Sequence, residues 1–221
     1  MNITTTSPAR PTTVILDFDG TVTLADVGDE ICRRFADPRW LDIDQLWEDK
    51  RISLPEAQEG MWALVQGAPG DILAHARDVG RIRPGLDDLL DACRRSDLVL
   101  ASGGFDFYIR AILGARLERF AAVYSNCGVL SDRGVAVSFP HRVALGCALC
   151  AVCKGRIVDD RRAAGRRVVF IGDGTSDRCV VGRADLLFAV HGSKLARACR
   201  DAGAPAVEFE TLDDVARQLF A

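Results

Sequence analysis

The chain has 221 residues, of which 27% are charged, and a formal net charge of −3. This length suits one large domain or a core with a smaller insertion, and the charge balance provides no basic surface for nucleic acid. No apolar run approaches the roughly 18 residues of a membrane span, so we expect no membrane segment. Because of the charge balance, we also expect no nucleic-acid partner.

The first eleven residues are rich in threonine and proline and contain no apolar run. They lack the pattern of a signal peptide, so we expect residues 1–11 to form a flexible tail. Eight cysteines in a chain without an export signal are typical of free thiols or metal ligands rather than of a disulfide framework. We therefore expect a cytoplasmic protein.

An apolar run at residues 14–16 predicts the first strand, which leads into Asp-Phe-Asp-Gly-Thr from Asp17 on. Residues two apart in a strand point the same way, so the carboxylates of Asp17 and Asp19 emerge together. Two like charges this close imply a bound cation, a shared proton, or both. A calcium-binding loop would need glycine and glutamate where Val22 and Gly28 stand. A plain polar turn after a strand is the other alternative.

Residues 26–80 carry apolar side chains at helical spacing and contain no strand candidate. Three prolines in this segment stand near predicted helix starts. We therefore expect a helical cap at residues 26–80, inserted after the first strand into a core made of residues 12–25 and 81–221.

Short apolar strands alternate with helices in the rest of the chain, which predicts a parallel sheet with helices on both faces. A hairpin is expected within residues 126–140, and further strands at residues 98–101, 121–124, 168–171, 186–190 and 206–209. Polar, glycine-bearing motifs follow three strands, at Asp17, Ser102 and Asp173. The carboxyl ends of parallel strands meet at one edge, where open α/β sheets bind ligands, so these motifs predict one site.

The tripeptide Ser102-Gly103-Gly104 combines a hydroxyl with unhindered backbone N–H groups just before a predicted helix. That combination suits a phosphate, although a plain strand-to-helix turn can have the same composition. Lys154 is the best candidate cation for the remaining phosphate charge. A single lysine of this kind is more often a solvated helix residue.

The segment Gly172–Asp177 resembles the dinucleotide-binding fingerprint, but Asp177 replaces its final glycine, and two acids in this turn would repel a pyrophosphate. Near Asp17 and Asp19, the carboxylates of Asp173 and Asp177 would instead complete an oxygen-rich site for a hard cation. Mg²⁺ prefers a few carboxylates together with water and substrate oxygens, so we expect it as the cofactor.

Three cysteines, Cys147, Cys150 and Cys153, stand at intervals that allow one tetrahedral Zn²⁺, with His141 or Cys127 as a fourth ligand. An iron–sulfur cluster would need a further cysteine soon afterwards, which the sequence lacks. Three reduced thiols that pack a loop are the alternative to a structural zinc ion.

The order of these motifs resembles the haloacid dehalogenase superfamily, in its phosphoserine-phosphatase-like branch, over residues 12–221. Within that branch the chain is most similar to methionine-salvage 2-hydroxy-3-keto-5-methylthiopentenyl-1-phosphate phosphatases. These share Ser-Gly-Gly, an acid nine residues after the nucleophile and a cysteine-rich run ahead of the lysine. The resemblance implies a Rossmann-like, doubly wound core with a helical cap. It also implies Mg²⁺-dependent hydrolysis of a small-molecule phosphate ester.

The resemblance implies a role for each matching acid. Asp17 is the nucleophile that forms an aspartyl phosphate, and Asp19 is the general acid/base. The Mg²⁺ ligands are Asp17, the Asp19 carbonyl and Asp173. Asp177 orients the metal-bound waters or Lys154.

The resemblance also implies which residues bind substrate. Ser102 and Lys154 clamp the phosphate beside the backbone of Gly103 and Gly104. Asp26 occupies the place where phosphoserine phosphatases carry a glutamate that reads the substrate's amino group. Asp26 could therefore read an amine or a hydroxyl group.

The cap argues against phosphoserine as the substrate. Phosphoserine phosphatases carry a cap arginine for the substrate carboxylate, but residues 56–64 contain neither arginine nor lysine. An unpaired carboxylate is costly to bury, so we expect phosphoserine to be a poor substrate. Met61, Trp62 and Leu64 would line a more apolar pocket if they face the site, although residues at helical spacing are more often core.

Three alternative functions differ in what they require of the site. A phosphotransferase or mutase of the same superfamily would keep every motif and differ only in the acceptor. A dehalogenase would leave Asp19 and the metal-binding acids without a task. A non-catalytic module organised by metal at the cysteines would not need the complete catalytic set that the chain carries.

Overall fold

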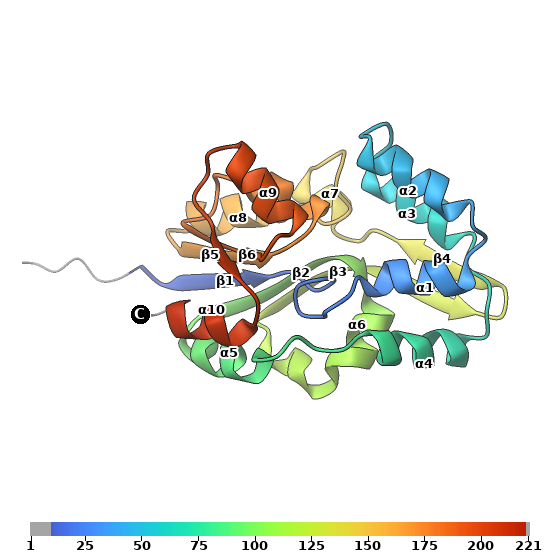
Figure 1. Ribbon diagram of the computed structural model, residues 1–221, viewed down its shortest axis with the longest axis horizontal. Coiled ribbons are helices and arrows are strands. Elements are labelled where there is room, and N and C mark those ends of the chain that lie inside the picture. Colours follow the sequence, from blue (N-terminus) through green and yellow to red (C-terminus); the bar gives the residue numbers. More distant parts are fainter. Residues whose placement is uncertain (1–9, 220–221) are drawn as a thin grey trace, which may run out of the picture.

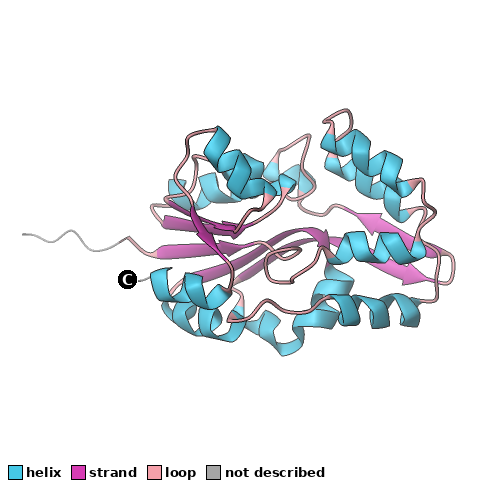
Figure 2. Ribbon diagram, viewed as in Figure 1, coloured by secondary structure: helices cyan, strands magenta, loops and turns pink. Residues whose placement is uncertain are grey.

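The computed structural model describes residues 10–219, so most of the expected tail, residues 1–9, lies outside the described part. Within that range seven strands form one sheet in the order β4-β3-β2-β1-β5-β6-β7 (Figure 2). β4 is antiparallel to β3, and the other pairs are parallel. The predicted doubly wound α/β sheet is confirmed. The strands are β1 (Thr12–Leu16), β2 (Asp97–Phe105), β3 (Ala122–Ser131), β4 (Gly134–Ser138), β5 (Arg167–Gly172), β6 (Leu186–Val190) and β7 (Val207–Phe209).

Helices cover both faces of the sheet (Figure 1). Val14 and Leu16 of β1 point into the core on one face and Ile15 into the core on the other, and all three are fully buried. A central strand buried on both faces reads as a continuous apolar run, which is why β1 is predictable. One face carries α5 (Leu86–Ala92), α6 (Asp106–Leu113) and α10 (Leu212–Leu219), and the other carries α8 (Lys154–Ala163) and α9 (Lys194–Asp201).

Residues 26–80 form four helices between β1 and β2, as the sequence predicts, and α5 and η1 follow them before β2. Asp26 caps the first by accepting a hydrogen bond from the Asp29 amide, and Ser53 and Glu56 form a capping box at the third. Side chains of this kind satisfy the free N–H groups of a first helical turn. The helices are α1 (Val27–Phe35), α2 (Trp40–Glu48), α3 (Leu54–Trp62) and α4 (Pro69–Val79).

The predicted hairpin is present as β3 and β4, which pair around a turn at Asp132 and Arg133. The strand expected at residues 121–124 is the first part of β3, which continues unbroken to Ser131 and so also forms the first strand of the hairpin. Asn126, which is typical of turns, is fully buried here and donates a hydrogen bond to the Gly103 carbonyl at 2.6 Å. Helix α3 packs against β4, so the hairpin supports the helices inserted after β1 (Figure 1).

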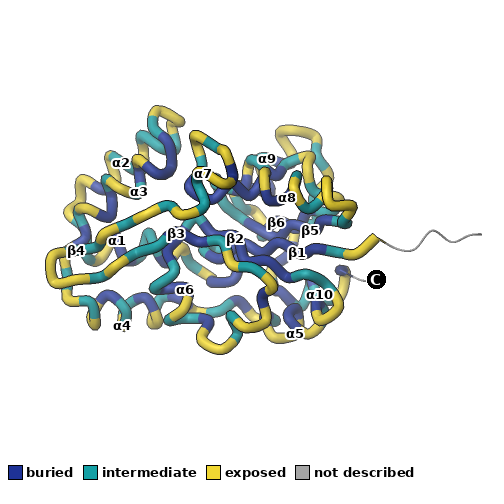
Figure 3. Tube along the Cα trace, turned by 180° about the vertical axis from the view of Figure 1, so that it is seen from behind, coloured by how far each residue is buried: buried dark blue, intermediate teal, exposed yellow. Residues whose placement is uncertain are grey.

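The middle of the sheet is buried, whereas the hairpin and the outer helices carry most of the exposed backbone (Figure 3). Among the described residues, no helix is both long and apolar enough to cross a membrane. The remaining short helices are α7 (Arg142–Leu145), η1 (Cys93–Arg95), η2 (Gly114–Arg119) and η3 (Thr175–Val180).

Candidate active site

Asp17 follows β1 directly, and its carboxylate is almost completely buried. The Phe18 amide donates to Asp17 Oδ1 at 2.8 Å, and the chain then turns tightly as the Val22 amide donates to the Phe18 carbonyl. Gly20 has a positive φ of 72°, and a Cβ atom there would lie 2.4 Å from the Asp173 carboxylate. The turn therefore requires glycine, and it brings the first and last motifs into contact.

Arg83 anchors this turn from outside the catalytic motifs. Its buried guanidinium donates to the carbonyls of Gly20 at 2.7 Å, Thr21 at 2.8 Å and Glu210 at 2.9 Å. Thr21 in turn donates its hydroxyl to Asp173 Oδ1 at 2.7 Å. The sequence analysis missed Arg83, because a lone arginine between a helix and a proline carries no motif.

The Asp19 carboxylate is held by three donors that come from different elements. The Val27 amide donates to Oδ1 at 3.1 Å, and the Tyr108 hydroxyl donates to Oδ2 at 2.9 Å. The Ser102 hydroxyl lies 3.4 Å from Oδ2. Burial and the charge of Asp26 raise the pKa of Asp19 well above its usual range, while the bonds from Tyr108 and Val27 lower it. The side chain is therefore fixed and kept available for protonation.

Replacing Tyr108 with phenylalanine should lower kcat about tenfold, because one hydrogen bond to a charged group contributes about 1.5 kcal/mol. Phenylalanine keeps the ring contacts with Phe18 and Phe107, so the fold should persist. Steady-state kinetics should show kcat falling with little change in KM. The matched control is Tyr124→Phe, outside the site, and an equal loss in both variants would contradict a positioning role for Tyr108.

Ser102, Gly103 and Gly104 lie where β2 shifts its register against β3, between Ala101 and Phe105. The Gly104 amide donates to Ser102 Oγ at 2.9 Å. A Cβ atom on Gly104 would lie 1.7 Å from the Tyr108 hydroxyl. The two glycines line the cavity described below, whereas Ser102 is fully buried behind them.

Lys154 begins α8 and is completely buried, although its sequence context suggests a solvated helix residue. Its Nζ atom lies 2.6 Å from Asp17 Oδ1, 2.5 Å from Asp177 Oδ1 and 3.2 Å from Ser176 Oγ. Burial lowers the pKa of Lys154, but Asp17 and Asp177 outweigh this effect and raise the pKa above its usual value. The two carboxylates therefore favour the charged form of this ammonium group.

Asp17, Asp173 and Asp177 bring one carboxylate oxygen each to within 4.8 Å of one another. Asp177 Oδ2 already accepts from the amides of Asp173 at 2.9 Å and Gly174 at 3.0 Å. Burial and Asp177 raise the pKa of Asp17 well above its usual range and that of Asp173 to about 7. Three acids face the ammonium group of Lys154, so this group of side chains has a negative excess that fits a divalent metal ion.

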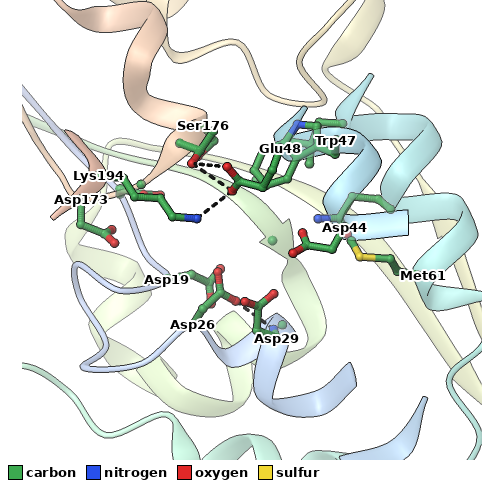
Figure 4. A pocket seen from close by; sticks show the side chains of 18 of the residues that line it. Asp19, Asp26, Asp29, Asp44, Trp47, Glu48, Met61, Asp173, Ser176 and Lys194 are labelled. Carbon is green, nitrogen blue, oxygen red and sulfur yellow. Dashed lines mark hydrogen bonds and ion pairs between the residues drawn. The ribbon is translucent and has the colours of Figure 1, made fainter. Parts of the chain in front are cut away.

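A cavity of about 400 Å³ lies between these strand ends and helices α1 to α3 (Figure 4). Asp19, Asp26 and Asp29 line one side, and Asp44 faces them from α2. Burial and neighbouring acids raise the pKa of Asp29 to about 8. Burial also raises the pKa of Asp26, although its side chain is open to the cavity and water reduces the effect. The carboxylates make this side of the cavity unfavourable for an anionic group.

The wall of the cavity formed by α2 and α3 is partly apolar, and polar contacts connect α2 to the segments that follow β5 and β6. Met61 and Trp62 line it as the sequence analysis allowed, but Leu64 does not. Glu48 of α2 accepts from Lys194 at 2.7 Å and from Thr175 at 3.1 Å (Figure 4). These contacts hold α2 over the turn that follows β5, and they join residues that no local sequence pattern connects.

The three predicted thiols do come together, since the sulfur atoms of Cys147, Cys150 and Cys153 lie within 4.8 Å of one another. The predicted fourth ligand is wrong. Neither His141 nor Cys127 belongs to this group among the described residues, and the His141 ring packs against Tyr124 at 5.0 Å. The cluster lies against the α8 and α9 side of the sheet, and none of its three cysteines lines the cavity.

The family model for haloacid dehalogenase-like hydrolases matches residues 14–181. The chain therefore belongs to this family of hydrolases, as the motif order predicts, and it is a phosphatase.

The chain is 30% identical over 210 residues to a 2-hydroxy-3-keto-5-methylthiopentenyl-1-phosphate phosphatase from Brevibacillus brevis, with 92% of each chain covered. The phosphatase of the same name from Bacillus pumilus is 28% identical over 93% of this chain and 89% of its own.

Solved phosphoserine phosphatases share the fold. A substrate-bound complex matches with a TM-score of 0.69 at 16% identity, covering 95% of this chain and 98% of the other. The enzyme from T. onnurineus matches with a TM-score of 0.65 at 19% identity, covering 96% of both.

Proposed function

We propose that the protein is a Mg²⁺-dependent phosphomonoesterase that hydrolyses a small phosphate ester through an aspartyl phosphate on Asp17. The observation that supports this most strongly is the position of the buried Asp17, which lines the cavity, lies 2.6 Å from Lys154 and has a carboxylate oxygen within 4.8 Å of one from Asp173. A carboxylate held there has a cation on one side and a metal-binding acid on the other. Attack by Asp17 on phosphorus divides a difficult hydrolysis into two easier steps.

The charges around Asp17 suit a transferring phosphoryl group. Asp17, Asp173 and the Asp19 carbonyl would hold Mg²⁺, which when bound supplies positive charge for the phosphoryl oxygens. Lys154 already has a second partner in Asp177, so it stays in place when its contact with Asp17 is exchanged for a phosphate oxygen. Both oxygens of Asp177 are used in holding this turn and Lys154, which favours an orienting role for it over direct ligation.

Asp19 is proposed as the general acid/base. It would protonate the departing alkoxide and later take a proton from the attacking water, which typically contributes about 10²–10⁴-fold. Its raised pKa and its bonds to Tyr108 and Val27 support this role. Ser102 and Lys154 are proposed to clamp the phosphate beside Gly103 and Gly104, which line the cavity, and the Ser102 hydroxyl lies 3.4 Å from Asp19 Oδ2.

Residues 26–80 are proposed to act as a cap on a core formed by residues 12–25 and 81–221. Helices α1 to α3 supply the walls of the cavity, and the Glu48 contacts to Lys194 and Thr175 hold them closed over it. A closed cap would exclude bulk water while Asp17 is phosphorylated. We also propose a reducing compartment such as the cytoplasm, because the cysteines are all free thiols.

Mg²⁺ dependence gives the direct test of the function. Pure protein should hydrolyse a generic aryl phosphate, lose this activity in EDTA, and regain it when Mg²⁺ alone is added back. Activity that is unchanged after exhaustive chelation would contradict the proposed metal site. Phosphate that moves to an added alcohol in preference to water would favour a phosphotransferase.

We further propose that the leaving group is a small, partly apolar alcohol with hydroxyl, keto or amino groups and no carboxylate near the phosphate. The acids Asp26, Asp29 and Asp44 would repel a carboxylate and accept hydrogen bonds from hydroxyl or amino groups. Two basic side chains line the cavity: Lys194 is paired with Glu48, and Arg197 donates to the Gly192 carbonyl. The substrate in the names of the relatives above is one compound of this kind.

The substrate prediction can be tested with matched phosphates. We expect kcat/KM for phosphoserine to be at least about tenfold below that for the best sugar, keto-sugar or amino-alcohol phosphate, because an unpaired carboxylate is costly to bury. The variant Asp26→Asn keeps the α1 cap and removes only the charge. It should change the ranking of the substrates. An equal loss for every substrate, or phosphoserine as the best substrate, would contradict the proposal.

A further inference from the structure

A fourth cysteine lies beside the thiol cluster, and it comes from a distant part of the chain. Cys147, Cys150 and Cys153 lie in the loop between α7 and α8, whereas Cys179 lies in η3, after β5. The Cys179 sulfur adjoins those of Cys150 and Cys153, and it lies outside the group of three whose sulfur atoms are all within 4.8 Å of one another. The Gly155 amide also donates to Cys179 Sγ at 3.2 Å.

We propose that Cys147, Cys150, Cys153 and Cys179 form a structural site for one tetrahedral divalent ion of the zinc class. Four thiolates are a complete ligand set for structural zinc, so no histidine is needed. An N–H donor on a ligand sulfur, as Gly155 provides here, is the kind of outer contact that orients a metal ligand. A Cβ atom on Gly155 would lie 2.6 Å from the Cys179 carbonyl, so this close approach of the two segments depends on glycine.

The site would fix the catalytic cation without touching substrate. Cys153 immediately precedes Lys154, and Cys179 follows two residues after Asp177, the partner of Lys154. One ion would therefore tie together the two segments that carry this buried ion pair. The same loop also reaches the helices over the cavity, because the Leu149 carbonyl accepts from the Leu54 amide at 2.9 Å at the start of α3. The ligands are therefore positioning residues.

Elemental analysis of protein purified without chelator tests the site. Wild-type protein should carry about one zinc equivalent. Cys179→Ser should lose most of it, whereas Cys199→Ser should keep it. Cys199 is the matched control, because it is a buried thiol in the same core but outside the cluster. Less than about half an equivalent in wild-type protein, or full zinc in Cys179→Ser, would overturn the proposal.

A second measurement tests the thiolate site even if the Cys179→Ser variant fails to fold. Wild-type protein exchanged with Co²⁺ should show the intense thiolate charge-transfer bands and visible bands of a tetrahedral all-sulfur site. A mercurial reagent should release the ion together with reaction of four thiols. A Co²⁺ spectrum without thiolate bands would overturn the proposal. Mg²⁺-dependent turnover is assayed separately, so failure of the proposed thiolate site can be distinguished from failure of the proposed Mg²⁺ site.

Discussion

The variant Asp17→Asn should lose at least about 10⁴-fold in turnover and keep its fold, since removal of a catalytic nucleophile leaves only the surrounding electrostatic stabilisation. An amide does not attack phosphorus, and it is a poor ligand for Mg²⁺. Lys154 would keep Asp177 as a partner, so the charge balance of the site changes by one unit without leaving a buried cation alone. Steady-state hydrolysis of an aryl phosphate and a thermal melt give the two readouts.

Two variants control this experiment. Asp132→Asn changes an exposed acid at the tip of the hairpin and should leave kcat unchanged. Asp19→Asn should slow phosphorylation and dephosphorylation while leaving the nucleophile present. If Asp17→Asn retains more than a few per cent of wild-type turnover, Asp17 is not the nucleophile.

Lys154→Met should produce the largest combined loss of activity and stability. Removing one member of a buried ion-pair group typically costs about 3–5 kcal/mol in the free energy of unfolding, because the remaining charges stay buried without a partner. Here Asp17 and Asp177 would both lose the cation that lies 2.6 and 2.5 Å from them. Turnover should fall by about 10³-fold, the effect of losing a group that stabilises transition-state charge.

Chemical denaturation without added Mg²⁺ measures the stability term. Lys50→Met, at an exposed lysine, is the matched control and should change the free energy of unfolding by less than about 0.5 kcal/mol. The double variant Lys154→Met with Asp177→Asn should recover part of the lost stability, because one unpaired charge is removed. Equal stability of Lys154→Met and wild-type protein would contradict the structural role of the ion pair.

The positions of the three catalytic motifs are predictable from sequence, because parallel topology makes them converge. Asp17 and Asp173 follow strands of one parallel sheet and Ser102 lies in the later part of a third strand, β2, so their placement at one edge needs no knowledge of side-chain packing. Strand period alone places Asp17 and Asp19 on the same side. The periodicity of a strand does not predict the partners of Asp19, which in the structure accepts hydrogen bonds from Val27 and Tyr108.

The residues that sequence reasoning missed act over long separations and have ordinary types. Tyr108 contacts Asp19 because α6 packs beside the turn that follows β1. Arg83 contacts the Gly20 carbonyl because the segment after the helical insertion packs against the same turn. Cys179 stands alone in the sequence, 26 residues after Cys153. Its position beside the other thiols depends on how β5 places the turn that follows it, and this cannot be predicted from the spacing of cysteines in the sequence.

The most direct test of the account is to identify the phosphorylated residue. Asp19→Asn protein mixed with substrate and quenched in acid should hold phosphate, and borohydride should convert an aspartyl phosphate to homoserine that peptide mapping can locate. We expect homoserine at position 17 only when substrate is present, and none in Asp17→Asn protein. Label at any other residue, or turnover of substrate with no phosphoenzyme in either wild-type or Asp19→Asn protein, would contradict the central claim.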